Sequence, residues 1–197
     1  MKIRVVVALM VLASLIVGVV VGAGGCRELT PPHRSTTESI ERTEGVEEGI
    51  FGDAWGAVKD VIVATAAARA LADTANKVRH LAEELAEIDE AELTDDEKLL
   101  LARFYEVYWG YEDSVTLWNL ALEQEERAGE AVEGIVLYED GEPMVERADV
   151  MVETYDLPLL TSEADGTIRY VPEDSVQRLW RFARARAQEW LVPVMEG

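Results

Sequence analysis

Few side chains in this sequence have the types and spacing that chemistry requires. The chain has two histidines, His33 and His80, and Glu84 follows His80 by four residues, about one helical turn. Such a pair can share a metal ion, and it can equally be two neighbours on a helix surface. A di-iron bundle needs Glu-x-x-His motifs on two helices, and neither histidine follows a glutamate by three positions. The sequence therefore predicts no metal site and no cofactor.

Catalytic residues cannot be singled out either. The chain has 39 Asp and Glu residues, so close pairs of carboxylates occur by chance, and a glycosidase would need two of them in a cleft. A serine–histidine triad would need His80 in a pocket, whereas its surroundings predict a straight helix. The acidic segment 89–97 lacks the residue order of a calcium-binding EF-hand loop, and no glycine-rich phosphate loop is present. We therefore favour a non-enzymatic protein with no catalytic residues.

The net charge restricts the partners of the protein. The formal net charge is -21, from 39 acidic and 18 basic residues, and 49% of the residues are hydrophobic. A surface this negative repels phosphate backbones, which argues against a nucleic-acid partner. The hydrophobic content is sufficient for a folded core, so a disordered protein is not expected.

The single cysteine, Cys26, ends an apolar segment at the start of the chain. Lys2 and Arg4 come first, an apolar run follows over residues 5–23, and two glycines precede the cysteine. A basic start, an apolar run and small residues at its end are typical of a secretory signal. One cysteine excludes an intramolecular disulfide and a cysteine-based metal cage.

The residues Ala23-Gly24-Gly25-Cys26 resemble the lipobox of bacterial and archaeal lipoproteins, in which mostly small residues precede a cysteine. Ala23 stands where that pattern favours leucine or another larger aliphatic residue. The resemblance covers residues 1–26, and it implies that Cys26 is lipidated and becomes the first residue of the mature protein. Acyl chains on this thiol would hold the protein at the membrane by burying CH₂ groups.

Two alternatives to lipidation remain open at the N-terminus. An apolar run of this length also spans the hydrocarbon core, so it can remain as an uncleaved anchor, with Gly18 and Gly22 in a G-x-x-x-G spacing. The segment can also be cleaved and the protein released. All three alternatives put the rest of the chain outside, because Lys2 and Arg4 hold the N-terminus inside. We expect a protein at the extracytoplasmic side of the cell membrane, or one that is secreted or virion-associated.

Three regions follow from this topology. Residues 1–25 form the signal peptide or anchor, residues 26–49 a flexible tether, and residues 50–197 an acidic helical domain. The tether contains two adjacent prolines and a glutamate-rich run, and it lacks apolar periodicity. The alternative is that the first helix already begins at Ser39.

Two heptad seams predict a long antiparallel helical hairpin with coiled-coil packing. The first seam lies in a helix expected over 53–88, and the second in a helix that begins after a capping box at 94–97 and ends near 133. The first seam is mostly alanine and the second mostly aromatic, so each can fill the space that the other leaves. Their members are Val61, Ala64, Ala68, Leu71, Ala75, Val78, Ala82 and Leu85, and Leu101, Phe104, Tyr108, Tyr111, Val115, Trp118 and Leu122.

The C-terminal third adds shorter elements. We expect a helix over 143–155, with a strand over 150–155 as the alternative, and a last helix over 173–191. Residues 135–138 form a helical turn or a strand, which can pair with a strand at 167–171. The predicted fold class is mainly α: a long antiparallel helical hairpin plus one or two shorter C-terminal helices and at most a small β-hairpin.

Exposed aromatic and basic side chains are the candidates for partner binding. Tyr105 and Trp109 lie off the second seam, so they pack against a further neighbour or form a partner site. Arg178, Arg181 and Arg184 stand with Arg186 in a basic stretch of an acidic chain. They pair with the acidic body, or they form a face for an acidic partner or lipid headgroups. We therefore expect a membrane-tethered interaction or structural module that binds another protein or a second copy. An extracytoplasmic hydrolase and a small-ligand or cation-binding protein are the alternatives.

Overall fold

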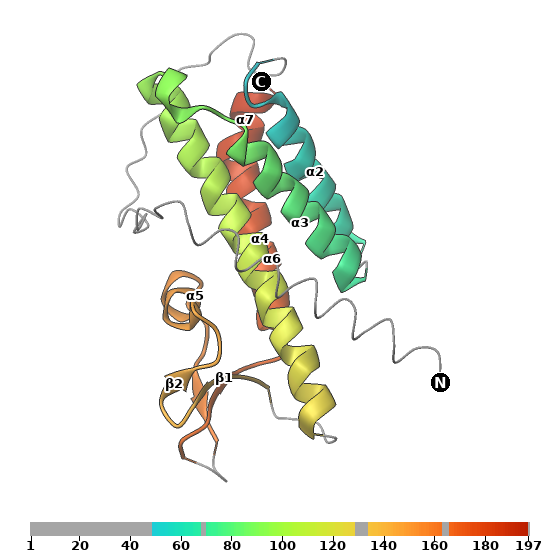
Figure 1. The fold of residues 1–197 in the computed structure, drawn as a ribbon, viewed down its shortest axis with the longest axis vertical. Coiled ribbons are helices and arrows are strands. Elements are labelled where there is room, and N and C mark those ends of the chain that lie inside the picture. The colour runs from blue at the N-terminus through green and yellow to red at the C-terminus, as the bar shows by residue number, and fades with distance from the viewer. Residues whose placement is uncertain (1–48, 68–69, 129–133, 163–165, 197) are drawn as a thin grey trace. The chain divides into compact units, whose positions relative to one another are not determined.

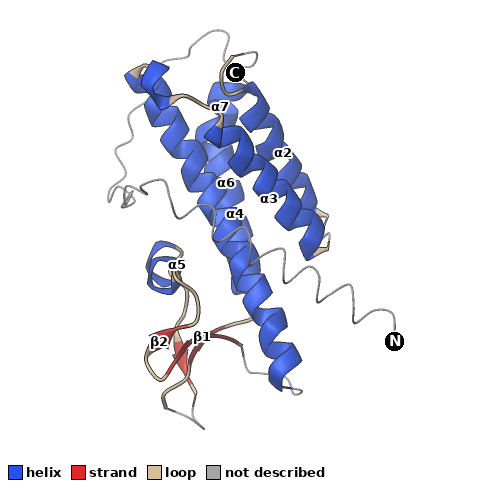
Figure 2. Cartoon of the chain, viewed as in Figure 1, coloured by secondary structure: helices blue, strands red, loops and turns tan. Residues whose placement is uncertain are grey.

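The computed structural model describes residues 49–67, 70–128, 134–162 and 166–196. Helices dominate this part of the chain, as Figure 2 shows, and a small sheet lies beside them, so the mainly helical fold class is confirmed. In Figure 1, α2 and α3 lie beside the upper half of α4, and the sheet and α5 lie beside its lower half. The bundle helices are α2 (Gly52–Ala66), α3 (Leu71–Ala86), α4 (Asp95–Ala128) and α6 (Ser175–Arg186).

The helix expected over 53–88 is two helices, α2 and α3, and the single-helix prediction is wrong in this respect. The Thr65 hydroxyl donates to the backbone carbonyls of Val61 and Ile62, a local bond that competes with regular helix geometry near the end of α2. Ala70, which precedes α3, has an extended backbone with φ -56° and ψ 145°. Folding back lets the buried faces of both helices contact α4, which one straight rod could not do.

Helix α4 begins as the sequence predicts. The Glu97 carboxylate accepts hydrogen bonds from the backbone N–H and the hydroxyl of Thr94, at 2.8 Å and 2.6 Å, and the Glu97 N–H donates to the Thr94 hydroxyl at 3.3 Å. These bonds form the capping box, and they lower the pKa of Glu97. The η3 turn (Glu90–Glu92) lies in the connection between α3 and α4.

Two cores lie along α4. In the first, the aromatic seam packs against α2, α3 and α6, and the ring of Phe104 stacks on that of Phe51 with centroids 5.5 Å apart. The second core joins the lower half of α4, through Leu117 and Leu120, to the sheet, α5 and α6. Leu122, the last seam residue, is exposed.

The sheet has four antiparallel strands in the order β2-β1-β4-β3, where the sequence predicted at most a hairpin. The strand alternative for 135–138 is correct, and this strand pairs with β4 as proposed. The side chain of Gln124 on α4 bonds to both the N–H and the C=O of Val136, so it fixes β1 against the helix. The strands are β1 (Ile135–Glu139), β2 (Glu142–Pro143), β3 (Leu160–Thr161) and β4 (Arg169–Val171).

The helix expected over 143–155 is shorter and begins later, as α5 (Ala148–Thr154). Asp140 and Gly141 have positive φ angles of 52° and 87°, which suit a tight hairpin turn. This turn places Pro143 of β2 opposite Tyr138 of β1. Proline is tolerated there because an edge strand needs no N–H donor on its outer side.

The last helix agrees with the expected range 173–191 but widens near its end. After α6, the π-helical turn η4 (Ala187–Leu191) leads into α7 (Val192–Met195). Pro193 lies in the first turn of α7. Proline lacks an N–H donor and crowds the carbonyl four residues earlier, so a widened turn accommodates it.

Candidate functional site

A continuous row of aromatic rings and guanidinium groups joins α4, the segment around α5 and α6. Neighbouring members make stacking contacts, except that Arg147 and Tyr155 are joined through the buried carboxylate of Asp113, to which both donate hydrogen bonds. We call this surface the aromatic–arginine face. Its members are Trp109, Arg147, Tyr155, Phe182, Arg186 and Trp190.

Asp113 holds two members of the aromatic–arginine face, Arg147 and Tyr155, in place. Its side chain is 1% exposed, and it accepts two hydrogen bonds from Arg147, from Nε at 2.8 Å and from Nη2 at 3.1 Å. The hydroxyl of Tyr155 donates a third bond at 2.7 Å. A buried carboxylate needs such partners, because desolvation of an unpaired charge is costly. The three bonds also hold Arg147 and Tyr155 in one geometry.

The Arg147 guanidinium lies over the ring of Trp109, 4.3 Å from its centroid. Trp109 is 37% exposed, and Tyr108 packs against its ring at 5.0 Å. A guanidinium stacked on an indole forms a cation–π contact, and here the Arg147 side chain itself remains 34% exposed. The stack therefore presents a rigid aromatic and basic surface to solvent.

A second stack follows along α6. Phe182 meets Tyr155 edge-on at 5.0 Å, and the Arg186 guanidinium lies 5.1 Å from the Phe182 ring and 4.3 Å from the Trp190 ring. Nη1 of Arg186 also donates to Glu189 at 3.1 Å. On α4, burial raises the pKa of Glu106, and the charges of Arg186 and Arg103 oppose that rise.

The residues that the sequence predicted as partner-binding do not form one surface in the structure. Trp109 belongs to the aromatic–arginine face, and Tyr105 is half-buried beside Tyr108, with ring centroids 6.5 Å apart. Arg178 precedes Phe182 by four residues, so it shares that side of α6, where it pairs with Asp174 at 3.3 Å.

The other two arginines lie elsewhere on α6. Arg181 donates to the Gln177 carbonyl oxygen at 3.3 Å and is exposed. Arg184 is exposed; burial raises the pKa of Tyr111, and Thr65 and the charge of Arg184 oppose that rise. The basic stretch is therefore spread over more than one side of the helix.

Sequence reasoning missed Arg147 as a member of a site, and it placed Arg186 in the basic stretch without predicting its contacts with Phe182 and Trp190. Phe182, Arg186 and Trp190 follow one another at four-residue spacing, which would have indicated a shared helix side. The partners Asp113 and Arg147 lie far apart in the sequence, and no local pattern indicates their contact.

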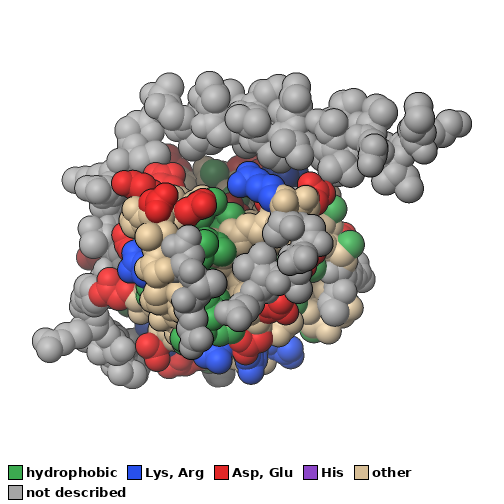
Figure 3. Space-filling view, turned by 90° about the horizontal axis from the view of Figure 1, so that it is seen from below, with side chains coloured by type: hydrophobic (Ala, Val, Ile, Leu, Met, Phe, Trp, Pro, Cys, Tyr) green, Lys and Arg blue, Asp and Glu red, His purple; other side chains and the backbone are tan. Residues whose placement is uncertain are grey.

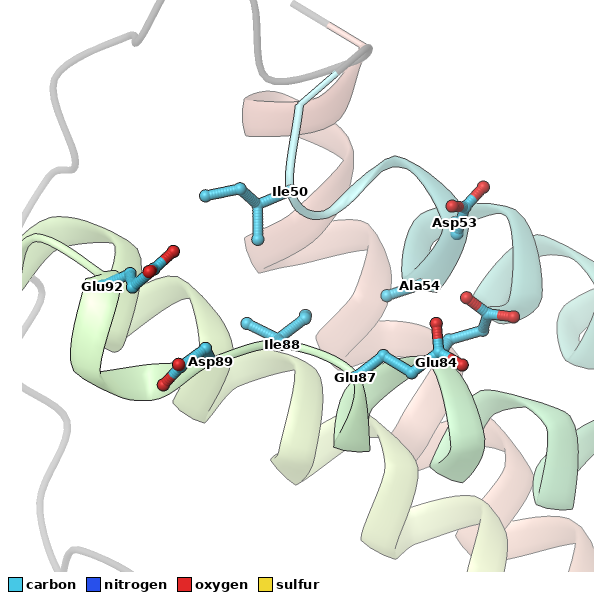
Figure 4. A pocket seen from close by; sticks show the side chains of 8 residues that line it. All are labelled: Ile50, Asp53, Ala54, Glu84, Glu87, Ile88, Asp89 and Glu92. Atoms are coloured by element: carbon cyan, nitrogen blue, oxygen red, sulfur yellow. The ribbon is translucent and has the colours of Figure 1, made fainter.

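A shallow pocket of about 280 Å³ lies between the start of α2 and the C-terminal end of α3. Figure 4 shows its carboxylates arranged around the side chains of Ile50 and Ile88. Its lining contains no histidine and no hydroxyl nucleophile, so it holds no serine–histidine pair. The lining consists of Ile50, Ala54 and Ile88 together with Asp53, Glu84, Glu87, Asp89 and Glu92.

The remaining candidates for chemistry are isolated. Nδ1 of His80 lies 3.5 Å from Glu84 and 3.8 Å from Glu83 on an exposed helix surface. Among the described residues, no three His, Cys, Asp or Glu side chains are grouped to hold a metal ion, and no helix there is long and apolar enough to cross a membrane. Cys26, the expected lipid attachment site, lies outside the described residues.

Acidic and basic side chains both lie at the end of the molecule where the sheet is. Figure 3 views the end at which the sheet lies and shows Asp and Glu side chains around its outline, with Lys and Arg side chains between them.

Comparison with protein-family models, curated proteins and solved structures gives no match, so no relative indicates a family or an activity.

We expect Glu112→Gln to raise the melting temperature near pH ~7, with no gain below pH ~4.5. Burial raises the pKa of Glu112 above its ordinary value of 4.5; Asp113 raises it further, and Arg79 and Arg147 lower it. The charged form is thus disfavoured in the folded state. Protonation stabilises the fold at low pH, and this contribution is lost as the pH rises through the raised pKa.

Thermal melts of both proteins across this pH range measure the difference. Glu125→Gln, an exposed substitution on the same helix, is the matched control and should change little. A loss of stability in Glu112→Gln near pH ~7 would show that the Glu112 carboxylate makes a favourable contact that outweighs its burial.

Proposed function

We propose that this chain is a membrane-tethered extracytoplasmic module that binds a partner protein through the aromatic–arginine face. One observation carries the proposal: the partly exposed Trp109–Arg147 stack, fixed from below by buried Asp113. Tryptophan, tyrosine and arginine are the residues most enriched at binding hot spots. A side chain that is already held in place loses little entropy when a partner binds.

The charge distribution supports the same surface. A partner with acidic groups is repelled by most of this chain, whose net charge is -21, and meets stacked guanidinium groups at the aromatic–arginine face. The membrane tether is the second half of the proposal, and it rests on the lipobox-like sequence that ends at Cys26. A tether confines the face to the vicinity of the membrane.

A photo-cross-linking experiment on the full chain tests both halves. A photoreactive phenylalanine analogue replaces Trp109 in one protein and Leu122, an exposed residue near the far end of α4, in a matched control. We expect a cross-linked adduct from position 109 in the membrane fraction and none from position 122. In a Cys26→Ser background, the protein should move to the medium and lose the mass of the lipid.

Each half has its own contradicting outcome. No adduct at position 109, or equal adducts at both positions, would show that this face does not bind a partner. An unchanged mass and full membrane retention of the Cys26→Ser protein would replace the lipid anchor with an uncleaved transmembrane segment.

A further inference from the structure

The end of the bundle where α3 leads into α4 is densely acidic. Residues 83–97 contain nine carboxylates and no lysine or arginine. These side chains are exposed or half-buried, and five of the described carboxylates in this region, counting Asp53 of α2, line the pocket of Figure 4. We call residues 83–97 together with this pocket the acidic tip.

The pocket of the acidic tip has a specific chemical preference. Its lining combines the apolar side chains of Ile50, Ala54 and Ile88 with five carboxylates. Ile50 is 54% exposed, so its side chain is available for contact. The combination suits an aromatic ring that carries a cation beside it, because the ring contacts the isoleucines while the cation pairs with the carboxylates.

The aromatic–arginine face has the matching chemistry. Arg186 lies against the rings of Phe182 and Trp190, and Arg147 lies against Trp109, so each guanidinium accompanies an aromatic ring. None of these residues lines the pocket, so the two surfaces are separate in one molecule. They can meet only between two molecules.

We infer that the partner of the aromatic–arginine face is the acidic tip of a second copy of this chain. This inference rests on the proposed function and names its partner. Two different surfaces meet, so the contact is heterologous and joins molecules head to tail. A pair joined in this way still has one free tip and one free face, so association on a membrane extends into rows.

The large net charge sets the conditions for this contact. At about 0.15 M salt the Debye length is ~8 Å, so repulsion between whole molecules is screened while pairs in direct contact still attract. At low salt the unscreened repulsion between two copies of charge -21 opposes association. Tethering both copies to one membrane raises their effective concentration.

A charge-swap experiment tests the inference with the full chain in detergent micelles. Arg186→Glu reverses the face, and Glu87→Arg with Glu92→Arg reverses the tip. We expect sedimentation velocity at about 0.15 M salt to show self-association of the native chain and an association constant about tenfold or more weaker for each variant alone. Mixing the two variants should restore association, because each reversed surface then meets its opposite.

Matched controls lie at the far end of α4. Arg127→Glu makes the same charge change as Arg186→Glu, and Glu125→Arg with Glu126→Arg makes the same change as the tip variant. These residues are exposed and lie outside both surfaces, so the control variants should leave association unchanged. Circular dichroism confirms that each variant is folded. If Arg186→Glu unfolds, Arg186→Gln replaces it, and the expected result is the same loss of association.

Several outcomes would overturn the inference. These are a native chain that stays monomeric, variants that associate like the native chain, and a mixture that does not recover association. If any of these occurs while position 109 still cross-links to a different protein, the second-copy inference fails and the proposed function stands. If position 109 also gives no adduct, both fail.

Discussion

Arg147→Met is expected to lower the free energy of unfolding by about 3–5 kcal/mol, the usual cost of removing one partner from a buried ion pair. Asp113 is 1% exposed, and two of its three hydrogen bonds come from Arg147. The substitution leaves a buried carboxylate with only the hydroxyl of Tyr155. Methionine keeps much of the side-chain volume, so the loss reports the charge and its hydrogen bonds.

Urea unfolding near neutral pH measures this loss. The double substitution Asp113→Leu with Arg147→Met removes both charges, and it should recover part of the stability, because replacing both partners of a buried pair is often close to neutral. The control is Arg127→Met, which breaks an exposed pair with Glu123 and should cost at most ~1 kcal/mol. Similar small losses for Arg147→Met and Arg127→Met would mean that Asp113 finds other partners or water.

Gly110→Ala is expected to lower the free energy of unfolding by about 1–2 kcal/mol although alanine favours helices. A Cβ atom at Gly110 would lie 2.8 Å from the Cβ of Ala183, closer than two carbon atoms can approach. Helices α4 and α6 must therefore move apart, which loosens the contacts of both cores. This cost exceeds the gain of about 1 kcal/mol in helix propensity.

Gly56→Ala is the matched control on α2. A Cβ atom there meets nothing within 4 Å, so only the propensity gain remains, and we expect stabilisation by about 0.5–1 kcal/mol. Thermal and urea unfolding of both variants should therefore give opposite signs. If Gly110→Ala is also stabilising, the two helices separate at little cost, and their close approach at this point is not required.

Local signals account for the parts of the fold that were predicted correctly. The Thr94–Glu97 capping box marked the start of α4, and the spacing of apolar residues marked the buried side of α6. The break between α2 and α3 left no comparable mark, since alanine favours helix on both sides of it. The sheet was underestimated because β2 and β3 have two residues each, too few for a periodic pattern.

The candidate site was only partly predictable for a related reason. Trp109 stood out because it lies off the apolar seam of its own helix, which is a local property. Its partner Arg147 follows a hairpin turn and precedes Ala148 of the second core, and only the folded chain brings Trp109 and Arg147 together. The arginines of α6 were predicted as one group, whereas Arg178 and Arg186 share the side of Phe182, and Arg181 and Arg184 lie on other sides of the helix.

The sheet lies in the segment between α4 and α6, and this position determines how well the protein tolerates insertions there. Helices α2, α3 and α4 follow one another through short connections, whereas the pairing of α4 with α6 closes a loop that contains the whole sheet and α5. The entropy lost in closing a flexible loop grows only with the logarithm of its length, so doubling the length costs about 0.6 kcal/mol. Insertions between the strands therefore burden the helical bundle little, whereas α4 and α6 must keep their contact at Gly110 and Ala183.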